Sequence, residues 1–137
     1  METRKIDKDY ELIASSIIGI DKDIEYIRQS NVRIVFLSSD QEKKKNGKVV
    51  LGQCEKIPAK YQWCCPYDFA IVIFEPNVEE LTHEQIRILL KHELLHVGID
   101  LPEDDEHEET YSIRPHDVED FRVIIDEFGL EWADVVI

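Results

Sequence analysis

The sequence predicts an α+β fold in which a short mixed β-sheet packs against helices. Two segments with helical periodicity, residues 8–29 and 82–97, flank a region with three short strand-like segments. Strands and helices grouped in this way are typical of α+β proteins. No repeat, low-complexity tract or linker interrupts the 137 residues, so we expect a single domain over residues 1–137.

The first predicted element is a helix over residues 8–29. Its apolar residues recur at helical spacing, and Gly19 is a candidate break that would divide it into two pieces. A first strand is expected over residues 32–37. Asn46-Gly47 is typical of a two-residue hairpin turn and leads into a second strand over residues 48–57.

The third and most apolar strand is predicted over residues 69–74, ending before Pro76. The helix over residues 82–97 follows, and Thr82 and Gln85 can form a capping box at its start. The apolar stripe of this helix consists of Ile86, Leu89, Leu90, Leu94 and Val97. Gly98 follows the last periodic residue, where helices often end.

The C-terminal part is expected to contain an irregular loop and a second helix over residues 116–128. Pro115 suits a helix start, and the apolar residues after it recur at helical spacing. Trp132 and the tail at residues 135–137 would add a final packed segment or strand.

His92-Glu93-Leu94-Leu95-His96 has the form H-E-x-x-H and lies inside the predicted helix. Residues four apart on a helix share a face, so the two imidazoles can bind one metal ion together. Glu93 is rotated around the helix and can approach a metal-bound water without being a ligand. This pattern is typical of zinc peptidases. Because the motif and its helical context agree, we favour a metal site over two unrelated histidines.

A catalytic zinc ion normally has three protein ligands and one water, so a third ligand must lie outside the motif. The metzincin extension of the motif is excluded, because Ile99 and Pro102 stand where it has glycine and histidine. We favour His116, since a helix start is a firm platform for a ligand. His107, in an acidic run, is the second choice, and Asp100 is a further candidate.

Three elements of the chain together resemble the putative phage metallopeptidase family, small domains found in phages and prophages. They are the H-E-x-x-H motif, His116-Asp117-Val118-Glu119-Asp120-Phe121 and Phe128-Gly129-Leu130-Glu131-Trp132. With the strand-like segment before the motif, the resemblance covers residues 30–132. More distantly, the layout is similar to the SprT-like metalloproteases.

This resemblance implies a zincin-like domain whose sheet packs against an N-terminal helix, the motif helix and a C-terminal helix. It also implies that His92, His96 and His116 bind Zn²⁺ and that Glu93 is the base. Zinc lowers the pKa of a bound water to about 7, and Glu93 would take its proton and pass it to the leaving amine. Side chains that could stabilise the oxyanion are Tyr111, His107 and Arg114. Acceptors for the remaining ring nitrogens of the histidines are Asp100, Asp117 and Asp120.

The resulting hypothesis is a zinc-dependent endopeptidase that acts on protein or peptide substrates. One alternative is a non-catalytic domain that keeps the metal as a structural staple or a partner-binding module. Another is an SprT-like protease acting on DNA-associated proteins. An intact Glu93 favours the first hypothesis, because a structural metal site needs no base. By analogy with zincins, residues 69–74 or the strand next to them could hold an extended substrate, although their unbroken apolar run equally fits a buried central strand.

Charge and hydropathy narrow the choice of partners. Thirty acidic residues against 16 basic ones give a net charge of −14, which argues against binding to nucleic acid. We interpret the one basic cluster, residues 43–48, as a solvated loop tip with some affinity for anions. No apolar run of membrane-spanning length and no signal-like N-terminus occur, so we expect a cytoplasmic protein without membrane contact. Cys54, Cys64 and Cys65 are expected to be reduced thiols, and the oligomeric state stays open.

Overall fold

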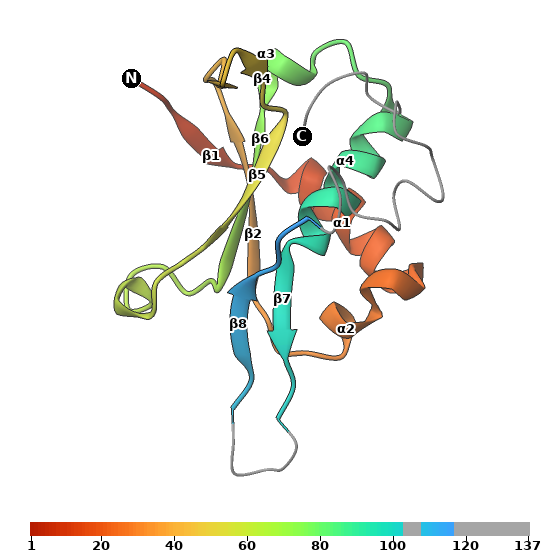
Figure 1. Ribbon diagram of the computed structural model, residues 1–137, viewed down its shortest axis with the longest axis vertical. Helices are drawn as coiled ribbons and strands as arrows, with labels where there is room; N and C mark the ends of the chain where they lie inside the picture. The colour runs from red at the N-terminus through yellow and green to blue at the C-terminus, as the bar shows by residue number, and fades with distance from the viewer. Residues whose placement is uncertain (103–107, 117–137) are drawn as a thin grey trace.

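The computed structural model describes residues 1–102 and 108–116. Its main sheet has four strands in the order β1-β2-β6-β5 (Figure 1). These strands are β1 (Arg4–Ile6), β2 (Ile34–Ser39), β5 (Gly52–Lys56) and β6 (Phe69–Phe74). β2 and β6 run parallel, whereas β1 and β5 are antiparallel to their neighbours. The predicted α+β class with a mixed sheet is therefore confirmed.

Helices α1, α2 and α4 lie on one face of this sheet (Figure 1). The helical segments are α1 (Lys8–Ile20), α2 (Glu25–Arg28), α3 (Glu75–Val78), α4 (His83–Leu95) and the 3₁₀ turns Lys22–Ile24 and Ala59–Tyr61. The helix predicted over residues 8–29 is interrupted at Asp21 and not at Gly19. The Asp21 carboxylate accepts a hydrogen bond of 2.9 Å from the Asp23 N–H, which caps the next turn and ends α1.

β6 occupies the interior of the sheet because both of its faces are apolar. All six of its residues are at most 5% exposed. Phe69, Ile71 and Ile73 belong to the core cluster that also includes side chains of α1 and α4. On the opposite face of the sheet, the Arg4 side chain of β1 extends over β6 to Glu55 of β5. Arg4 Nη1 donates a hydrogen bond of 3.1 Å to Glu55 Oε1. Because β6 is paired with β2 along one edge and with β5 along the other, it cannot add a substrate strand. Of the two interpretations of residues 69–74, the buried central strand is confirmed and the edge strand was wrong.

The turn predicted at Asn46-Gly47 is confirmed, since both residues have positive φ, 53° and 75°. It joins β3 (Lys44–Lys45) to β4 (Lys48–Val49), which form a small two-stranded sheet of their own. The single strand predicted over residues 48–57 is therefore two strands, β4 and β5. β1 was not predicted: it is a short, exposed and charged edge strand, a composition that protects a sheet edge but carries no apolar pattern.

α4 begins with the predicted capping box, in which Thr82 Oγ1 accepts from the Gln85 N–H at 3.2 Å and Gln85 Oε1 accepts from the Thr82 N–H at 2.9 Å. The helix ends at Leu95, two residues before the predicted end. A hairpin of β7 (Val97–Asp100) and β8 (Thr110–Ile113) follows, so the predicted irregular loop was wrong for these residues. Gly98 permits the close strand contact, because a Cβ there would lie 2.7 Å from the Ser112 carbonyl oxygen.

The helix predicted over residues 116–128 and the packed tail with Trp132 lie outside the described residues, apart from His116 itself. Among residues 1–102 and 108–116, no helix is both long and apolar enough to cross a membrane.

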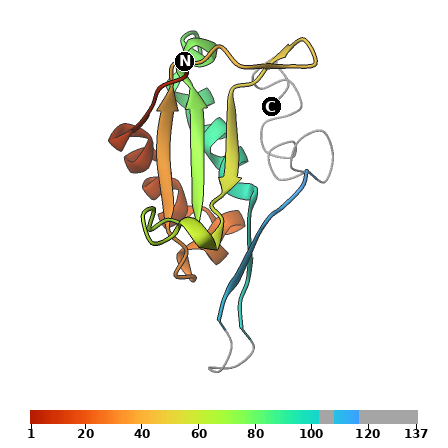
Figure 2. The ribbon, with the colours of Figure 1, turned by 90° about the vertical axis from the view of Figure 1, so that its left-hand side faces the viewer.

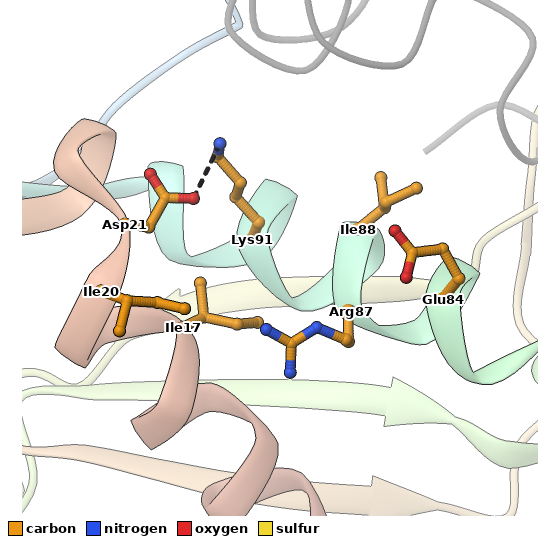
Figure 3. Close-up of a pocket in the computed structure, with 7 residues that line it drawn as sticks. All are labelled: Ile17, Ile20, Asp21, Glu84, Arg87, Ile88 and Lys91. Atoms are coloured by element: carbon orange, nitrogen blue, oxygen red, sulfur yellow. Dashed lines mark ion pairs between the residues drawn. The ribbon is translucent and has the colours of Figure 1, made fainter.

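Lys91 joins α4 to the end of α1 from a buried position. Its side chain is 5% exposed, and its Nζ lies 2.9 Å from carboxylate oxygens of both Asp21 and Asp23. Figure 3 shows the Asp21 pair in the groove of about 310 Å³ between α1 and α4. Burial raises the pKa of Asp21, but hydrogen bonds from Lys91 and the Asp23 N–H more than offset this, so the pKa lies below its usual value.

Replacing Lys91 by methionine is expected to lower the free energy of unfolding at pH 7 by about 1.5 kcal/mol, the lower end of the range for hydrogen bonds to charged groups, because the carboxylates of Asp21 and Asp23 are partly exposed and can regain water. The lowered pKa of Asp21 means that its stabilisation exists above its unfolded-state pKa of about 3.9 and disappears as the pH falls through the lower folded value. Urea denaturation should therefore show a difference between wild type and Lys91→Met that shrinks below about pH 4.

The matched control is Lys8→Met, which removes the exposed pair between Lys8 and Glu11 on α1. Such surface pairs contribute less than about 0.5 kcal/mol. If Lys8→Met and Lys91→Met lowered the free energy of unfolding equally, the buried Lys91 would not stabilise the fold more than a surface lysine does.

Candidate functional site

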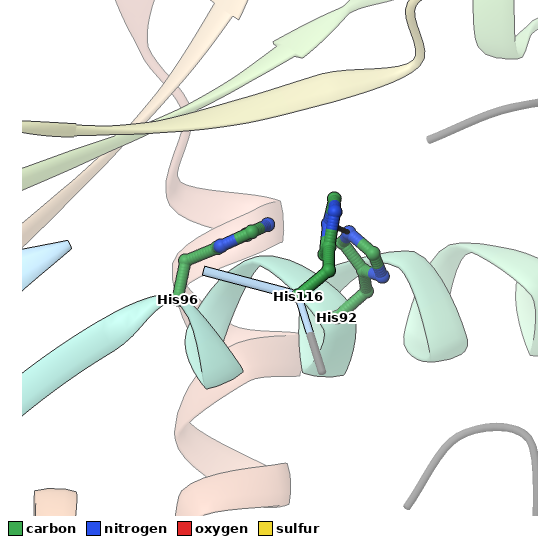
Figure 4. A group of neighbouring side chains, drawn as sticks. All are labelled: His92, His96 and His116. Atoms are coloured by element: carbon green, nitrogen blue, oxygen red, sulfur yellow. Dashed lines mark hydrogen bonds between the residues drawn. The ribbon is translucent and has the colours of Figure 1, made fainter. Parts of the chain in front are cut away.

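Three histidines from two elements gather at the C-terminal end of α4 (Figure 4). His92 and His96 lie one turn apart, with ring centroids separated by 5.1 Å. His116 follows β8, and its ring centroid lies 4.9 Å from that of His92 and 4.5 Å from that of His96. His92 Nε2 and His116 Nε2 are 3.1 Å apart. One nitrogen of each ring lies within 4.8 Å of the others.

The β7–β8 hairpin brings His116 back to the helix. The chain leaves α4 at His96, and the register pairs Val97 with Ile113. One step further, the Arg114 N–H donates to the His96 carbonyl at 2.7 Å. His116 is two residues beyond this pair and is therefore held above the last turn of α4. In the described residues, the antiparallel register positions His116.

The Arg114 carbonyl also fixes the ring of His96, because it lies 2.7 Å from Nδ1. When this nitrogen carries the proton and donates to the carbonyl, the Nε2 lone pair is left for a ligand bond. The sequence analysis proposed aspartates as acceptors for the second ring nitrogen of the histidines and did not predict the Arg114 carbonyl. No side-chain pattern can reveal it, since every residue type has a carbonyl and only the hairpin register selects this one.

The arrangement fits a metal ion such as zinc. Bonds of about 2.0–2.1 Å in tetrahedral directions separate ligand nitrogens by roughly 3.3 Å. The His92 and His116 Nε2 atoms are 3.1 Å apart, close to that value, and one nitrogen of each of the three rings lies within 4.8 Å of the others. Three imidazoles are also a usual donor set for zinc.

Glu93 is buried beside the histidines, with 1% of the residue exposed. Its Oε1 lies 4.0 Å from His92 Nε2. β5 passes directly over it at Gly52, where a Cβ would be 3.5 Å from Glu93 Cγ and 3.1 Å from the Val72 carbonyl oxygen. Cys54, two residues along β5, has a pKa raised by burial and by the nearby Glu93 carboxylate. Glycine at position 52 therefore lets the strand approach the carboxylate closely.

A cleft of about 570 Å³ opens over these groups. One wall contains Glu93, His96 and His116, and another contains Gly52, Gln53 and Cys54 of β5. The β3–β4 hairpin supplies further lining residues, namely Lys43, Lys45, Asn46, Lys48 and Val49. The sequence pattern predicted the histidines and Glu93 but not the contribution of β5 and the hairpin, which lie about forty residues earlier in the chain.

The other predicted site residues are not at the histidines or are outside the described residues. The Tyr111 hydroxyl donates to Glu109 at 2.8 Å, and its ring packs edge-on against Phe69 in a separate polar pocket. Asp100 is exposed on β7, where Thr110 Oγ1 lies 3.5 Å from its Oδ2. The structure therefore does not bring either residue to the three histidines. His107, Asp117 and Asp120 lie outside the described residues.

A comparison with protein families is consistent with this geometry. The chain matches the model described as "putative phage metallopeptidase" over residues 3–136. The chain belongs to this family. Its description points to a metal-dependent hydrolase whose substrates are proteins or peptides, and the resemblance inferred from the motifs is confirmed. No curated protein and no solved structure shows significant similarity to the chain.

Proposed function

We propose that this phage metallopeptidase family member is a zinc-dependent endopeptidase, with His92, His96 and His116 as metal ligands and Glu93 as general base. The observation that carries the proposal is the convergence of three imidazoles next to a buried carboxylate on one wall of an open cleft. When bound, zinc polarises the scissile carbonyl and makes a water acidic enough to lose a proton near neutral pH.

Glu93 would move the proton in this reaction. Its carboxylate takes a proton from the attacking water and then gives it to the nitrogen of the leaving amine. The close cover of β5 at Gly52 restricts the carboxylate and keeps bulk water from its far side. The Arg114 carbonyl holds His96 Nδ1–H, so this histidine keeps its Nε2 directed to the ligand position.

Among the described residues, β5 pairs with β6 along one edge, and its other edge is the proposed binding site for the substrate backbone. In the register with β6, Phe74 N–H donates to the Leu51 carbonyl and Ile57 N–H to the Asp68 carbonyl. Hydrogen-bonded pairs alternate along antiparallel strands, so the backbone groups of Gly52 and Cys54 face away from β6. Both residues line the cleft. An extended peptide could therefore add to this edge beside the histidines.

An open cleft favours a catalytic site over the non-catalytic alternative. Structural zinc sites are closed by a fourth protein ligand, whereas catalytic sites keep one position for water or substrate. Within the described ranges, the cluster of candidate ligands consists of the three histidines. A base at position 93 would also have no task in a structural site. The net charge of −14 argues against the DNA-directed alternative.

Metal removal tests the proposal. The purified full chain should bind about one zinc ion and cleave an unfolded protein, and a chelator should abolish cleavage because the water and carbonyl are then no longer activated. Added Zn²⁺ should restore cleavage, whereas Mg²⁺ should not, since imidazole ligands select transition metals. Mass spectrometry of the products and metal analysis provide the measurements. Cleavage that survives complete metal removal would rule the mechanism out, and bound zinc without cleavage would support the non-catalytic alternative.

A further inference from the structure

We propose that the cleft selects substrate segments rich in aspartate and glutamate, whose carboxylates are bound by Lys45 and Lys48 on the β3–β4 hairpin. This inference rests on the proposed peptidase function and names its substrate class. It depends on three observations: the position of the hairpin, the local reversal of charge and the rigid attachment of the hairpin to the fold.

The hairpin projects over the side of the sheet on which β5 is the edge strand (Figure 2). Lys45 and Lys48 line the same cleft as Glu93, His96 and His116. A peptide bound along β5 next to the histidines would therefore run toward the lysines. Its side chains, which alternate along an extended strand, would come within reach of their long and flexible ammonium groups.

The charge of the cleft is opposite to that of the chain. The chain carries a net charge of −14, yet lysines at positions 43, 45 and 48 line the cleft together with one described carboxylate, the proposed base Glu93. Lys45 and Lys48 are directly opposed in the hairpin register. No carboxylate within residues 1–102 and 108–116 forms an ion pair with either of them. Like charges directly across a strand pair are unfavourable, and an acidic ligand would relieve this repulsion.

The tip of the hairpin is exposed, as predicted, but the ends of the hairpin are held in place. The Asn77 side-chain amide, on α3, donates to the carbonyls of Lys43 and Val50 at 2.9 and 2.8 Å and so fixes both ends of the hairpin. Lys43 itself contacts Gln53 on β5 and lies 5.3 Å from the ring centroid of Phe74. Lys43 is therefore occupied by the fold, while Lys45 and Lys48 are exposed and directed by a rigid support. Such preorganisation lowers the cost of binding.

An acidic peptide fits this surface better than nucleic acid does. The lysines open onto a cleft that contains the proposed base and metal ligands, where a polypeptide has to lie for cleavage. A nucleic acid would instead have to follow a long basic surface, and the acidic remainder of the chain would repel its phosphates.

The test measures binding separately from cleavage. Zinc-loaded Glu93→Gln protein is titrated against two fluorescent peptides of the same length, one with three glutamates and one with glutamines in their place. Two exposed ion pairs should make the glutamate peptide bind about tenfold more tightly at 0.1 M salt. The preference should fall at 1 M salt, where the Debye length is only about 3 Å.

Substitutions in the same background assign the preference to the hairpin. Lys45→Gln/Lys48→Gln should abolish it, whereas Lys45→Arg/Lys48→Arg should retain it because the charge is kept. The control Lys8→Gln/Lys22→Gln removes the same charge from exposed positions that do not line the cleft and should also retain it.

Equal affinity for the two peptides, or a preference that survives Lys45→Gln/Lys48→Gln, would overturn the inference. The inference would also be overturned if single-stranded DNA bound more tightly than the glutamate peptide and Lys45→Gln/Lys48→Gln removed this binding. The hairpin would then be assigned to nucleic acid. If wild-type protein cleaves both peptides in a zinc-dependent way and binds them equally, the peptidase function stands and only the substrate preference is lost.

Discussion

Glu93→Gln is expected to lower kcat/KM for peptide cleavage by about 10²–10⁴, the usual contribution of a positioned general base. The amide has nearly the same shape as the carboxylate but cannot accept the proton of the attacking water. Because Glu93 is assigned as the base and the metal is assigned to the three histidines, zinc stoichiometry should remain at about one. A large loss of activity at unchanged zinc content would therefore show that proton transfer, and not metal binding, is impaired.

The matched control is Glu84→Gln, the same substitution in the exposed first turn of α4, on the groove between α1 and α4. It should leave kcat/KM within about twofold of wild type, since surface changes away from the site have small effects. Undiminished cleavage by Glu93→Gln would show that another group is the base. Loss of zinc from this variant would indicate that the carboxylate supports the metal site directly.

The sequence predicted those features of the fold that depend on local patterns. The capping box at Thr82 and Gln85 and the turn at Asn46-Gly47 are short-range signals, and the structure has both. The end of α4 was misplaced because Val97 continues the helical stripe of apolar residues. The same residue begins β7, where its partner Ile113 lies sixteen positions later. Tertiary pairing decided between two local structures that the sequence allowed.

In the candidate site, too, the features that depend on local spacing could be predicted and those that depend on tertiary pairing could not. His92 and His96 could be placed on one helical face from their spacing alone, and the structure has them one turn apart. His116 was chosen for a helix start, but the described residues bring it to the cluster through the hairpin register and the contact between Arg114 and His96. The approach of Gly52 to Glu93 could not be predicted, because it depends on how the sheet packs against α4.

His116→Ala is expected to weaken zinc binding by at least about 100-fold, because a ligand should matter no less than the groups that orient ligands, whose loss costs 10–100-fold. With zinc in excess, a 100-fold weaker affinity removes about 2.7 kcal/mol of metal-dependent stabilisation. Calorimetric titration gives the affinity, and denaturation with and without zinc gives the stabilisation.

Two alanine variants identify the third ligand by contrast. His83→Ala changes an exposed histidine at the start of α4 and should leave zinc affinity unchanged. His107→Ala tests the competing ligand considered from the sequence. If His107→Ala weakens zinc binding and His116→Ala does not, the metal is held from the acidic run, and the 3.1 Å approach of His116 to His92 has another role. If only His116→Ala weakens it, the hairpin that returns the chain to α4 completes the metal site.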